Sequence, residues 1–104
     1  MREKDLLRSV IERARFHGWH IYHPLPAVVG KNQRTMTAQL GHSGFPDLVL
    51  LRPPRLIFAE LKVGRNHPTV NQREWIDGLE RVPEVEMYVW RDRDWPDLIM
   101  ATLR

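Results

Sequence analysis

The chain has 104 residues, no cysteine and a formal net charge of +3. A chain of about this length forms one domain around one core, so we expect a single domain over residues 1–104. Without cysteine, neither a disulfide framework nor a cysteine-based zinc site can form. No run of about 18 apolar residues is present, which predicts that no helix spans a membrane. The charged N-terminus is unlike a signal peptide, so the expected compartment is the cytoplasm.

The basic side chains are unevenly distributed along the chain. Residues 1–46 hold 7 basic and 3 acidic side chains, whereas residues 47–104 hold 9 basic and 10 acidic ones. Most of the basic residues are arginine, whose planar guanidinium group donates two parallel hydrogen bonds to phosphate. A basic N-terminal half is compatible with a nucleic-acid partner, and a compositional bias toward arginine is the alternative explanation.

The hydrophobic pattern predicts an alternation of helices and strands. Apolar residues of the first segment recur at the spacing of one helical face, and Gly18 is suited to end that helix. The predicted helices cover residues 3–17, 69–81 and 96–103, and the predicted strands cover residues 19–23, 48–51, 56–63 and 85–90. Residues 24–46 have no period and are expected to form a long loop. The resulting order, α-β-β-β-α-β-α, predicts an α/β domain with a mixed four-stranded sheet flanked by helices.

Two acidic residues are expected to face each other across a hairpin. Strands 48–51 and 56–63 flank Pro53-Pro54, and a symmetric hairpin places Asp47 opposite Glu60. Because two prolines cannot adopt the positive φ values of a tight two-residue turn, we expect a wider loop. Two carboxylates at this separation repel each other unless a proton or a cation lies between them. Mg²⁺ prefers oxygen ligands of this kind, so the spacing predicts a metal site at one edge of the sheet.

Lys62 is expected on the same face as Glu60, because side chains alternate along a strand and Leu61 then points away. A structural pair between Lys62 and one of the acids is the alternative to a metal site. A third acid comes from the first helix. At steps of about 100° around the helix axis, Glu3 lies on the apolar stripe while Asp5 and Glu12 lie nearly opposite. Glu3 is therefore expected near the acids, and a helix-dipole role is its alternative explanation.

These motifs resemble the PD-(D/E)XK nuclease superfamily. The resemblance rests on Gly44-Phe45-Pro46-Asp47, a hydrophobic strand, a turn, a strand ending in Glu60-Leu61-Lys62 and Gln72 in the next helix. The resemblance covers residues 3–92. Within the superfamily, the chain is similar to the small stand-alone VRR-NUC type of phages and bacteria. It resembles archaeal Holliday junction resolvases more distantly. The resemblance implies a restriction-endonuclease-like core, a bacterial or phage-infected cell as the setting, and a homodimer.

The resemblance implies a role for each matching residue. Asp47 and Glu60 would bind Mg²⁺ or Mn²⁺ with the Leu61 backbone carbonyl. Glu3 would match the acid that the family carries on its first helix and would be a further metal ligand. Lys62 would position or activate the attacking water and stabilise developing charge. Gln72 would match the glutamine of the second helix. The same residue also fits a capping box with Thr69, and the sequence leaves both roles open.

The expected function is metal-dependent endonucleolytic hydrolysis of DNA phosphodiester bonds, and selectivity for branched or four-way DNA is a further expectation. Candidate phosphate contacts are Lys31, Arg34, Arg65 and His67, each of which has a solvent-exposed loop position as its alternative. His20 and His23 are spaced as a metal pair, but on a strand they would point to opposite faces. A DNA-binding module that does not cleave, or a structural subunit on the same fold, are the alternative functions.

Overall fold

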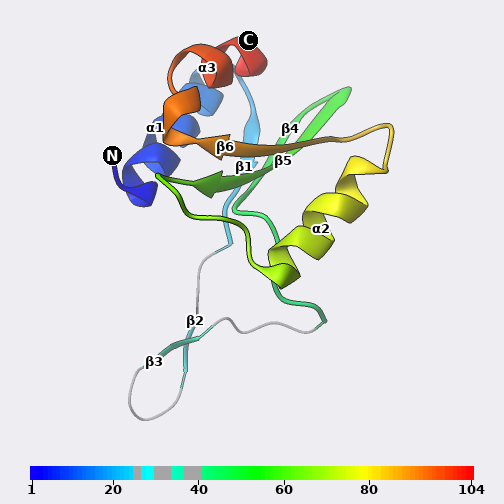
Figure 1. Cartoon of the computed structure of the whole chain (residues 1–104). Coiled ribbons are helices and arrows are strands. Elements are labelled where there is room, and N and C mark those ends of the chain that lie inside the picture. Colours follow the sequence, from blue (N-terminus) through cyan, green and yellow to red (C-terminus); the bar gives the residue numbers. More distant parts are fainter. Residues whose placement is uncertain (25–26, 30–33, 37–40) are drawn as a thin grey trace.

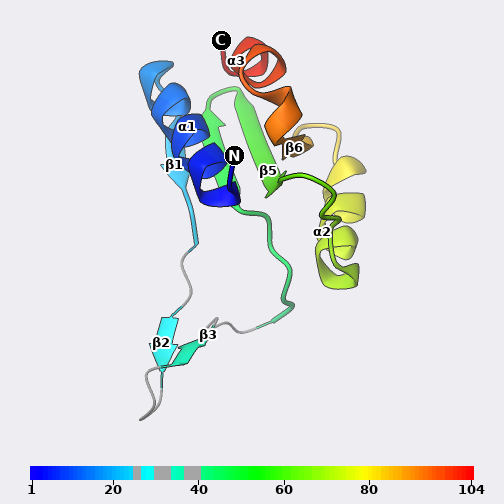
Figure 2. The same ribbon diagram turned by 60° about the vertical axis from the view of Figure 1, so that its left-hand side comes forward.

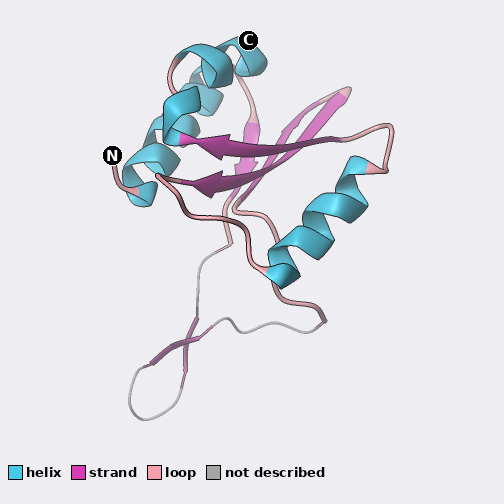
Figure 3. Ribbon diagram, viewed as in Figure 1, coloured by secondary structure: helices cyan, strands magenta, loops and turns pink. Residues whose placement is uncertain are grey.

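The computed structural model describes residues 1–24, 27–29, 34–36 and 41–104, with the backbone alone described for the two short segments. The elements, in chain order, are α1 (Glu3–Phe16), β1 (His20–Tyr22), β2 (Ala27–Val29), β3 (Arg34–Met36), β4 (Leu48–Arg52), β5 (Arg55–Lys62), α2 (Val70–Glu80), β6 (Glu86–Arg91), the 3₁₀-helix η1 (Asp92–Asp94) and α3 (Asp97–Leu103). Figures 1 and 3 show their arrangement. Outside residues 24–46, the predicted helices and strands all form, and each bound differs by at most one residue.

The main sheet has four strands in the order β1-β4-β5-β6. β4 pairs antiparallel with β1 and with β5, whereas β6 pairs parallel with β5. A parallel neighbour needs a crossover connection, and α2 supplies it between β5 and β6. The predicted α/β class and mixed four-stranded sheet are thereby confirmed, while the likeness to a restriction endonuclease core stays a prediction.

Helices cover both faces of this sheet. α1 and α3 lie together on one face and α2 lies on the other (Figures 1 and 2). The main hydrophobic core lies between the sheet and the α1–α3 layer. Its fully buried members include Leu6, Val10, Ala14, Leu48, Leu50, Ile57, Ala59, Leu61, Ile99 and Leu103. Because side chains alternate along β5, Glu60 and Lys62 point to the face opposite Leu61, as the sequence predicts.

Two short strands, β2 and β3, form within residues 24–46, where the sequence predicts a loop. β2 and β3 pair antiparallel within this segment, with Ala27 opposite Met36 and Val29 opposite Arg34, and form a separate two-stranded sheet. The expectation of a loop without secondary structure is therefore wrong at these positions. Strands of three residues are too short to display the alternation on which strand prediction depends.

The β4–β5 hairpin has the predicted register and a tighter turn than expected. Pairing runs from Leu48 opposite Ala59 to Arg52 opposite Arg55. Only Pro53 and Pro54 connect the strands, so the expectation of a wider loop is wrong. The peptide bond between the two prolines is cis. Proline holds φ at about −65°, so this two-residue connection closes without the positive φ values on which the expectation rested.

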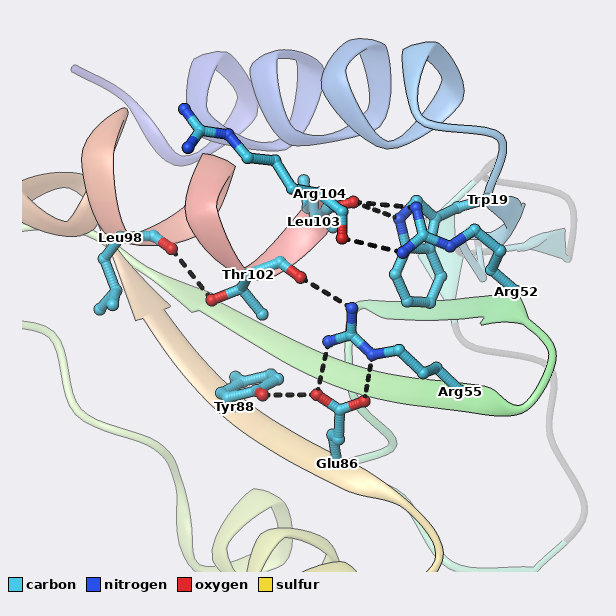
Figure 4. Close-up of polar contacts among 9 residues, drawn as sticks. All are labelled: Trp19, Arg52, Arg55, Glu86, Tyr88, Leu98, Thr102, Leu103 and Arg104. Carbon is cyan, nitrogen blue, oxygen red and sulfur yellow. Dashed lines mark hydrogen bonds and ion pairs between the residues drawn. The ribbon is translucent and has the colours of Figure 1, made fainter.

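Two arginines at this turn bind the last carbonyls of α3 (Figure 4). The Arg52 guanidinium donates to the carbonyl oxygens of His17, Leu103 and Arg104 at 3.0, 3.1 and 2.9 Å. Arg55 Nη1 donates to the Thr102 carbonyl at 3.0 Å. The final carbonyls of a helix have no partner within the helix, so these bonds satisfy groups that would otherwise be exposed or unpaired. They also place positive charge at the negative end of the α3 dipole.

The same arginines are held by an aromatic ring and a carboxylate. The Arg52 and Arg55 guanidinium carbons lie 4.4 and 5.0 Å from the ring centroid of Trp19, whose indole Nε1 donates to the Leu103 carbonyl at 2.9 Å. Arg55 also donates two hydrogen bonds to Glu86, at 2.8 and 2.7 Å. Cation–π contact and bidentate pairing fix both guanidinium groups, so this network joins the hairpin turn to α1, α3 and β6.

Replacing Arg52 should loosen α3 while leaving the rest of the sheet in place. Arg52→Ala removes three hydrogen bonds to carbonyl oxygens and one cation–π contact. We expect the free energy of unfolding to fall by about 2–3 kcal/mol, as measured by urea denaturation. Arg93→Ala, at an exposed position of η1, is the control and should change stability by less than about 0.5 kcal/mol. Equal effects of the two substitutions would contradict the anchoring role.

Candidate metal and active site

Asp47 lies immediately before β4 and is held from two neighbouring strands. Its Oδ2 accepts a hydrogen bond from the backbone N–H of Leu61 at 2.8 Å. Its own carbonyl oxygen lies 2.7 Å from Nδ1 of His23, directly after β1. A carbonyl oxygen can only accept, so Nδ1 of His23 carries the proton in this contact. Asp47 is therefore fixed through both its main chain and its side chain.

The length of β5 explains why Leu61 has an N–H for Asp47. β4 pairs with β5 only as far as Leu48 opposite Ala59. Beyond that point β5 continues beside β6 alone, with Glu60 opposite Val89 and Lys62 opposite Arg91. The Asp47 carboxylate accepts a hydrogen bond from the Leu61 N–H, in the place where a longer β4 would supply a backbone carbonyl. This arrangement brings Asp47 next to Glu60, as the predicted register requires.

Glu60 is a buried carboxyl group whose nearest polar neighbour is another carboxyl, that of Asp47, with which it can pair only by sharing a proton. Its residue is 1 % exposed, and neither of its carboxylate oxygens has a hydrogen-bond partner among the residues described. Burial, together with the neighbouring Asp47 carboxyl, raises the pKa of Glu60 to about 9. A buried, unpaired carboxylate is strongly unfavourable in its charged form. A proton or a cation must therefore accompany Glu60 at this position.

Two more charged groups act on this pair. The ammonium of Lys62, half-buried at the end of β5, works against the rise in the pKa of Glu60. The pKa of Glu3 is also raised, by partial burial and then by the Asp47 carboxylate, while Lys62 opposes that rise. Electrostatic interactions therefore link four charged side chains: Glu3 in α1, Asp47 just before β4, and Glu60 and Lys62 at the end of β5.

The other acids of α1 lie elsewhere. Asp5 accepts a hydrogen bond from the backbone N–H of Arg2 at 3.1 Å, and this bond lowers the pKa of Asp5. Glu12 is exposed. Glu3 is thus the acid of α1 whose charge interacts with Asp47 and Glu60, and its role in chemistry stays a prediction.

The acids lie at the end of the two central strands and not at a lateral edge of the sheet. β1 and β6 form the edges, and β4 and β5 lie between them. The expectation of a site at one edge is therefore wrong. Hydrophobic pattern does not determine strand order, and here β1 adds beside β4 so that the hairpin becomes central. This position allows the His23 contact from β1 as well as the Leu61 contact from β5.

Gln72 makes the capping contacts that the sequence offers as one of its two roles. Its Oε1 accepts from the backbone N–H of Thr69 at 2.8 Å, and its own N–H donates to Thr69 Oγ1 at 3.2 Å. These two bonds satisfy donors of the first turn of α2. The side-chain oxygen of Gln72 is thereby engaged, and a catalytic role for this residue stays a prediction.

The candidate phosphate contacts are only partly described. Arg65 and His67 are exposed in the loop between β5 and α2, which follows Lys62 directly. Lys31 lies outside the described residues, and for Arg34 the structure describes the backbone in β3 alone. Arg65 and His67 are therefore accessible in the loop that follows the acidic residues. Their exposure agrees both with phosphate binding and with a role as solvated surface residues.

The Gly44–Asp47 motif has a packing function that the sequence reading missed. Gly44 has φ +93°, and a Cβ atom there would lie 2.5 Å from the carbonyl carbon of Asn71 in α2. The segment is also bound to α2 by Asn71 Nδ2 donating to Ser43 Oγ at 2.6 Å and by Trp75 Nε1 donating to the Ser43 carbonyl at 3.1 Å. Phe45 packs edge to face on Trp75, with ring centroids 5.0 Å apart. The first half of α2 is therefore bound to the segment that precedes Asp47 by hydrogen bonds and by close packing.

The residues present fit a hard divalent cation. The two orphaned oxygens of Glu60 and the carboxylate of Asp47 are the donor types that Mg²⁺ and Mn²⁺ bind. A group of three or more His, Asp or Glu side chains arranged to hold a metal ion is not found within residues 1–24 and 41–104 or the two short strands. The fit accordingly rests on two carboxylates, and the Leu61 carbonyl as a further ligand stays a prediction.

Comparison with protein-family models, with curated proteins and with solved structures gives no match to this chain. In the part of the chain that is described, no helix has both the length and the apolar character needed to cross a membrane. Membership of the PD-(D/E)XK superfamily therefore stays a resemblance carried by the motif residues and their geometry.

Adding a methyl group at Gly44 should displace α2 from the Asp47 segment. Gly41 is a matched control because it has a similar φ, +96° against +93°, yet a Cβ atom there would meet nothing within 4 Å, whereas at Gly44 it would make contacts under 3.0 Å. Both alanine variants carry the backbone strain, and only Gly44→Ala adds the collision. We expect Gly44→Ala to lose about 1–3 kcal/mol more unfolding free energy than Gly41→Ala in urea denaturation. Equal losses would show that backbone conformation alone matters.

The buried Glu60 should make the metal-free protein less stable at higher pH. Its folded-state pKa of about 9 lies above the ordinary value of 4.5, so between these values the folded chain holds a proton that the unfolded chain releases. The contribution of Glu60 to stability is therefore full below about pH 4.5 and is lost as the pH rises toward 9. Glu60→Gln cannot ionise, so its melting temperature in EDTA should fall less between pH 5 and pH 9.

The measured quantity is the difference in slope between wild type and Glu60→Gln, because other groups titrate in the same range. Glu74→Gln, at an exposed position of α2, is the control and should follow the wild-type slope. Glu60→Gln is also expected to be more stable than wild type at pH 8 without metal. If its melting temperature changes with pH as steeply as that of wild type, Glu60 is not the buried group that the structure indicates.

Proposed function

We propose that this protein is a metal-dependent endonuclease that hydrolyses DNA phosphodiester bonds. The observation that carries the proposal is the buried, unpartnered carboxylate of Glu60 beside Asp47, with Lys62 on the same face of β5. A purely structural acid would be expected to have a hydrogen-bond or ion-pair partner at this depth. No donor group reaches Glu60 among the described residues, and its carboxyl neighbour Asp47 can pair with it only by sharing a proton. Two carboxyls placed in this way support a cation that completes the site.

The chain's own residues divide the work of such a reaction. Asp47 and Glu60 would hold Mg²⁺ or Mn²⁺, with the Leu61 carbonyl in support. The ion, when bound, would supply charge neutralisation and a water of lowered pKa. Lys62 would position or activate the attacking water and would place an ammonium where phosphate oxygens gain negative charge. Glu3 would add negative charge close to Lys62 and Asp47 and so help to orient the ammonium.

The Leu61 N–H contributes by fixing the Asp47 side chain. It engages Oδ2 at 2.8 Å, so the carboxylate is held in one orientation before any ligand arrives. Preorganisation of this kind lowers the cost of ordering the site during binding. Arg65 and His67, exposed just beyond Lys62, are proposed to contact the DNA backbone. Branched or four-way DNA as the preferred substrate, and a homodimer with one site for each of two strands, are proposed from the family resemblance.

A cleavage assay tests the proposal. Labelled linear, flapped and four-way DNA would be incubated with the protein in Mg²⁺ or Mn²⁺. Wild type should cut at least one substrate, and Glu60→Gln should reduce the rate by at least about 100-fold. Glu74→Gln should cut at the wild-type rate. Because Glu60→Gln removes the ionisable group without changing the shape of the side chain, circular dichroism should show that it stays folded.

The alternatives give different results in the same experiment. A DNA-binding module without cleavage would retard the DNA in a gel and leave it intact in both metals. A structural subunit would do neither. Equal cutting by wild type and Glu60→Gln would point to a contaminating nuclease, and absence of Mn²⁺ binding in a calorimetric titration of wild type would reject the nuclease proposal.

A further inference from the structure

His23 makes a contact that the proposed reaction does not yet use. Pairing between β1 and β4 ends with Tyr22 opposite Val49, and pairing between β4 and β5 ends with Leu48 opposite Ala59. Asp47 lies beyond both ladders, so no strand partner holds its main chain. The imidazole of His23 takes that place, with Nδ1 lying 2.7 Å from the Asp47 carbonyl oxygen. His23 is half-buried, which keeps water from competing freely for this bond.

The two bonds of Asp47 restrain different parts of the residue. The bond from His23 fixes the position of the carbonyl, and with it the peptide plane between Asp47 and Leu48. The bond from the Leu61 N–H to Oδ2 fixes the rotation of the side chain. A rotation of the Asp47 main chain would carry its side chain with it and would move the carboxylate away from the Leu61 N–H. The orientation of the Asp47 carboxylate beside Glu60 is thus restrained in part by His23, which follows β1.

We propose that His23 is a positioning residue, which holds Asp47 so that its carboxylate is oriented toward Glu60 for binding of a divalent cation. The consequence for cleavage rests on the proposed nuclease function, whereas the consequence for the Asp47–Leu61 bond does not. His23 acts through the main chain of Asp47 and need not touch the cation or the DNA. A latch that only joins β1 to β4 is the competing explanation. If His23 were only such a latch, His23→Ala would lower the unfolding free energy of the whole domain without a selective effect at Asp47.

The test compares three variants of the whole chain. His23→Ala removes the donor. His23→Asn places an amide N–H near the position of Nδ1 and should restore the bond. His20→Ala is the control, since His20 is exposed in β1, three residues before His23, and makes no contact with Asp47 among the described residues.

The first readout is hydrogen exchange of backbone amides, measured by NMR on metal-free protein. His23→Ala should speed exchange of the Leu61 amide by at least about tenfold relative to the Ile57 amide in the middle of β5. The second readout is calorimetric titration with Mn²⁺ well below the melting temperature. His23→Ala should weaken the affinity about 10- to 100-fold, as expected for the loss of a group that orients a metal ligand. His23→Asn should recover most of both effects, and His20→Ala should match wild type.

The outcomes separate this inference from the proposed function. If exchange at Leu61 and Mn²⁺ affinity are unchanged in His23→Ala, the inference is wrong. If every β5 amide exchanges faster to the same extent and His23→Asn does not recover, His23 is a structural latch and the inference is also wrong. If wild type binds no Mn²⁺, the nuclease proposal fails, and the Leu61 amide alone then decides whether His23 positions Asp47.

Discussion

Glu60 places a carboxylate in the interior of the sheet with 1 % of the residue exposed and no hydrogen-bond partner within the described chain. The cost of burying such a group is several kcal/mol unless it is protonated or paired. The surrounding groups add to this cost, because Asp47 and Glu3 disfavour the charged form and only Lys62 favours it. The fold therefore maintains an unfavourable position for a group that a polar or apolar residue could replace. This is the expected cost of a site that is completed by a ligand.

The two ends of the β4–β5 hairpin show how that cost is offset. At the turn, Arg52 binds three carbonyl oxygens and Arg55 makes a bidentate pair with Glu86. Here Arg55 is paired with a carboxylate and Arg52 donates to backbone oxygens, and the contacts join α1, α3 and β6 to the hairpin. At the other end, β5 extends beyond β4 and pairs with β6 alone. The Glu60 side chain lies there without a hydrogen-bond donor among the described residues. Satisfied polar contacts at one end of the strands thus stabilise a fold that tolerates an unsatisfied group at the other.

Sequence patterns predict the parts of this arrangement that depend on local periodicity. The spacing around Pro53-Pro54 predicts the hairpin register that is observed. Alternation along β5, which continues through Lys62, puts Glu60 and Lys62 on one face. Strand order was not predictable, because β1 could add to either side of the hairpin with the same pattern. The β2–β3 pairing was missed because its strands are too short to alternate visibly. The contact of Gly44 with Asn71 depends on where α2 packs, and no local signal records it beyond the glycine itself.

The same distinction separates the stability of the fold from the geometry of the site. Asp47 belongs to neither strand ladder, and its position depends on the His23 imidazole, the Leu61 N–H and the grip of α2 on the segment that begins at Ser43. These contacts come from the end of β1, the end of β5 and the start of α2, and each adds little to the hydrophobic core. Small changes in any of them would move the Asp47 carboxylate while the core between the sheet and α1 stayed packed. The distance between the two acids is therefore set by a few polar contacts, and substitutions there would alter the site before they unfold the chain.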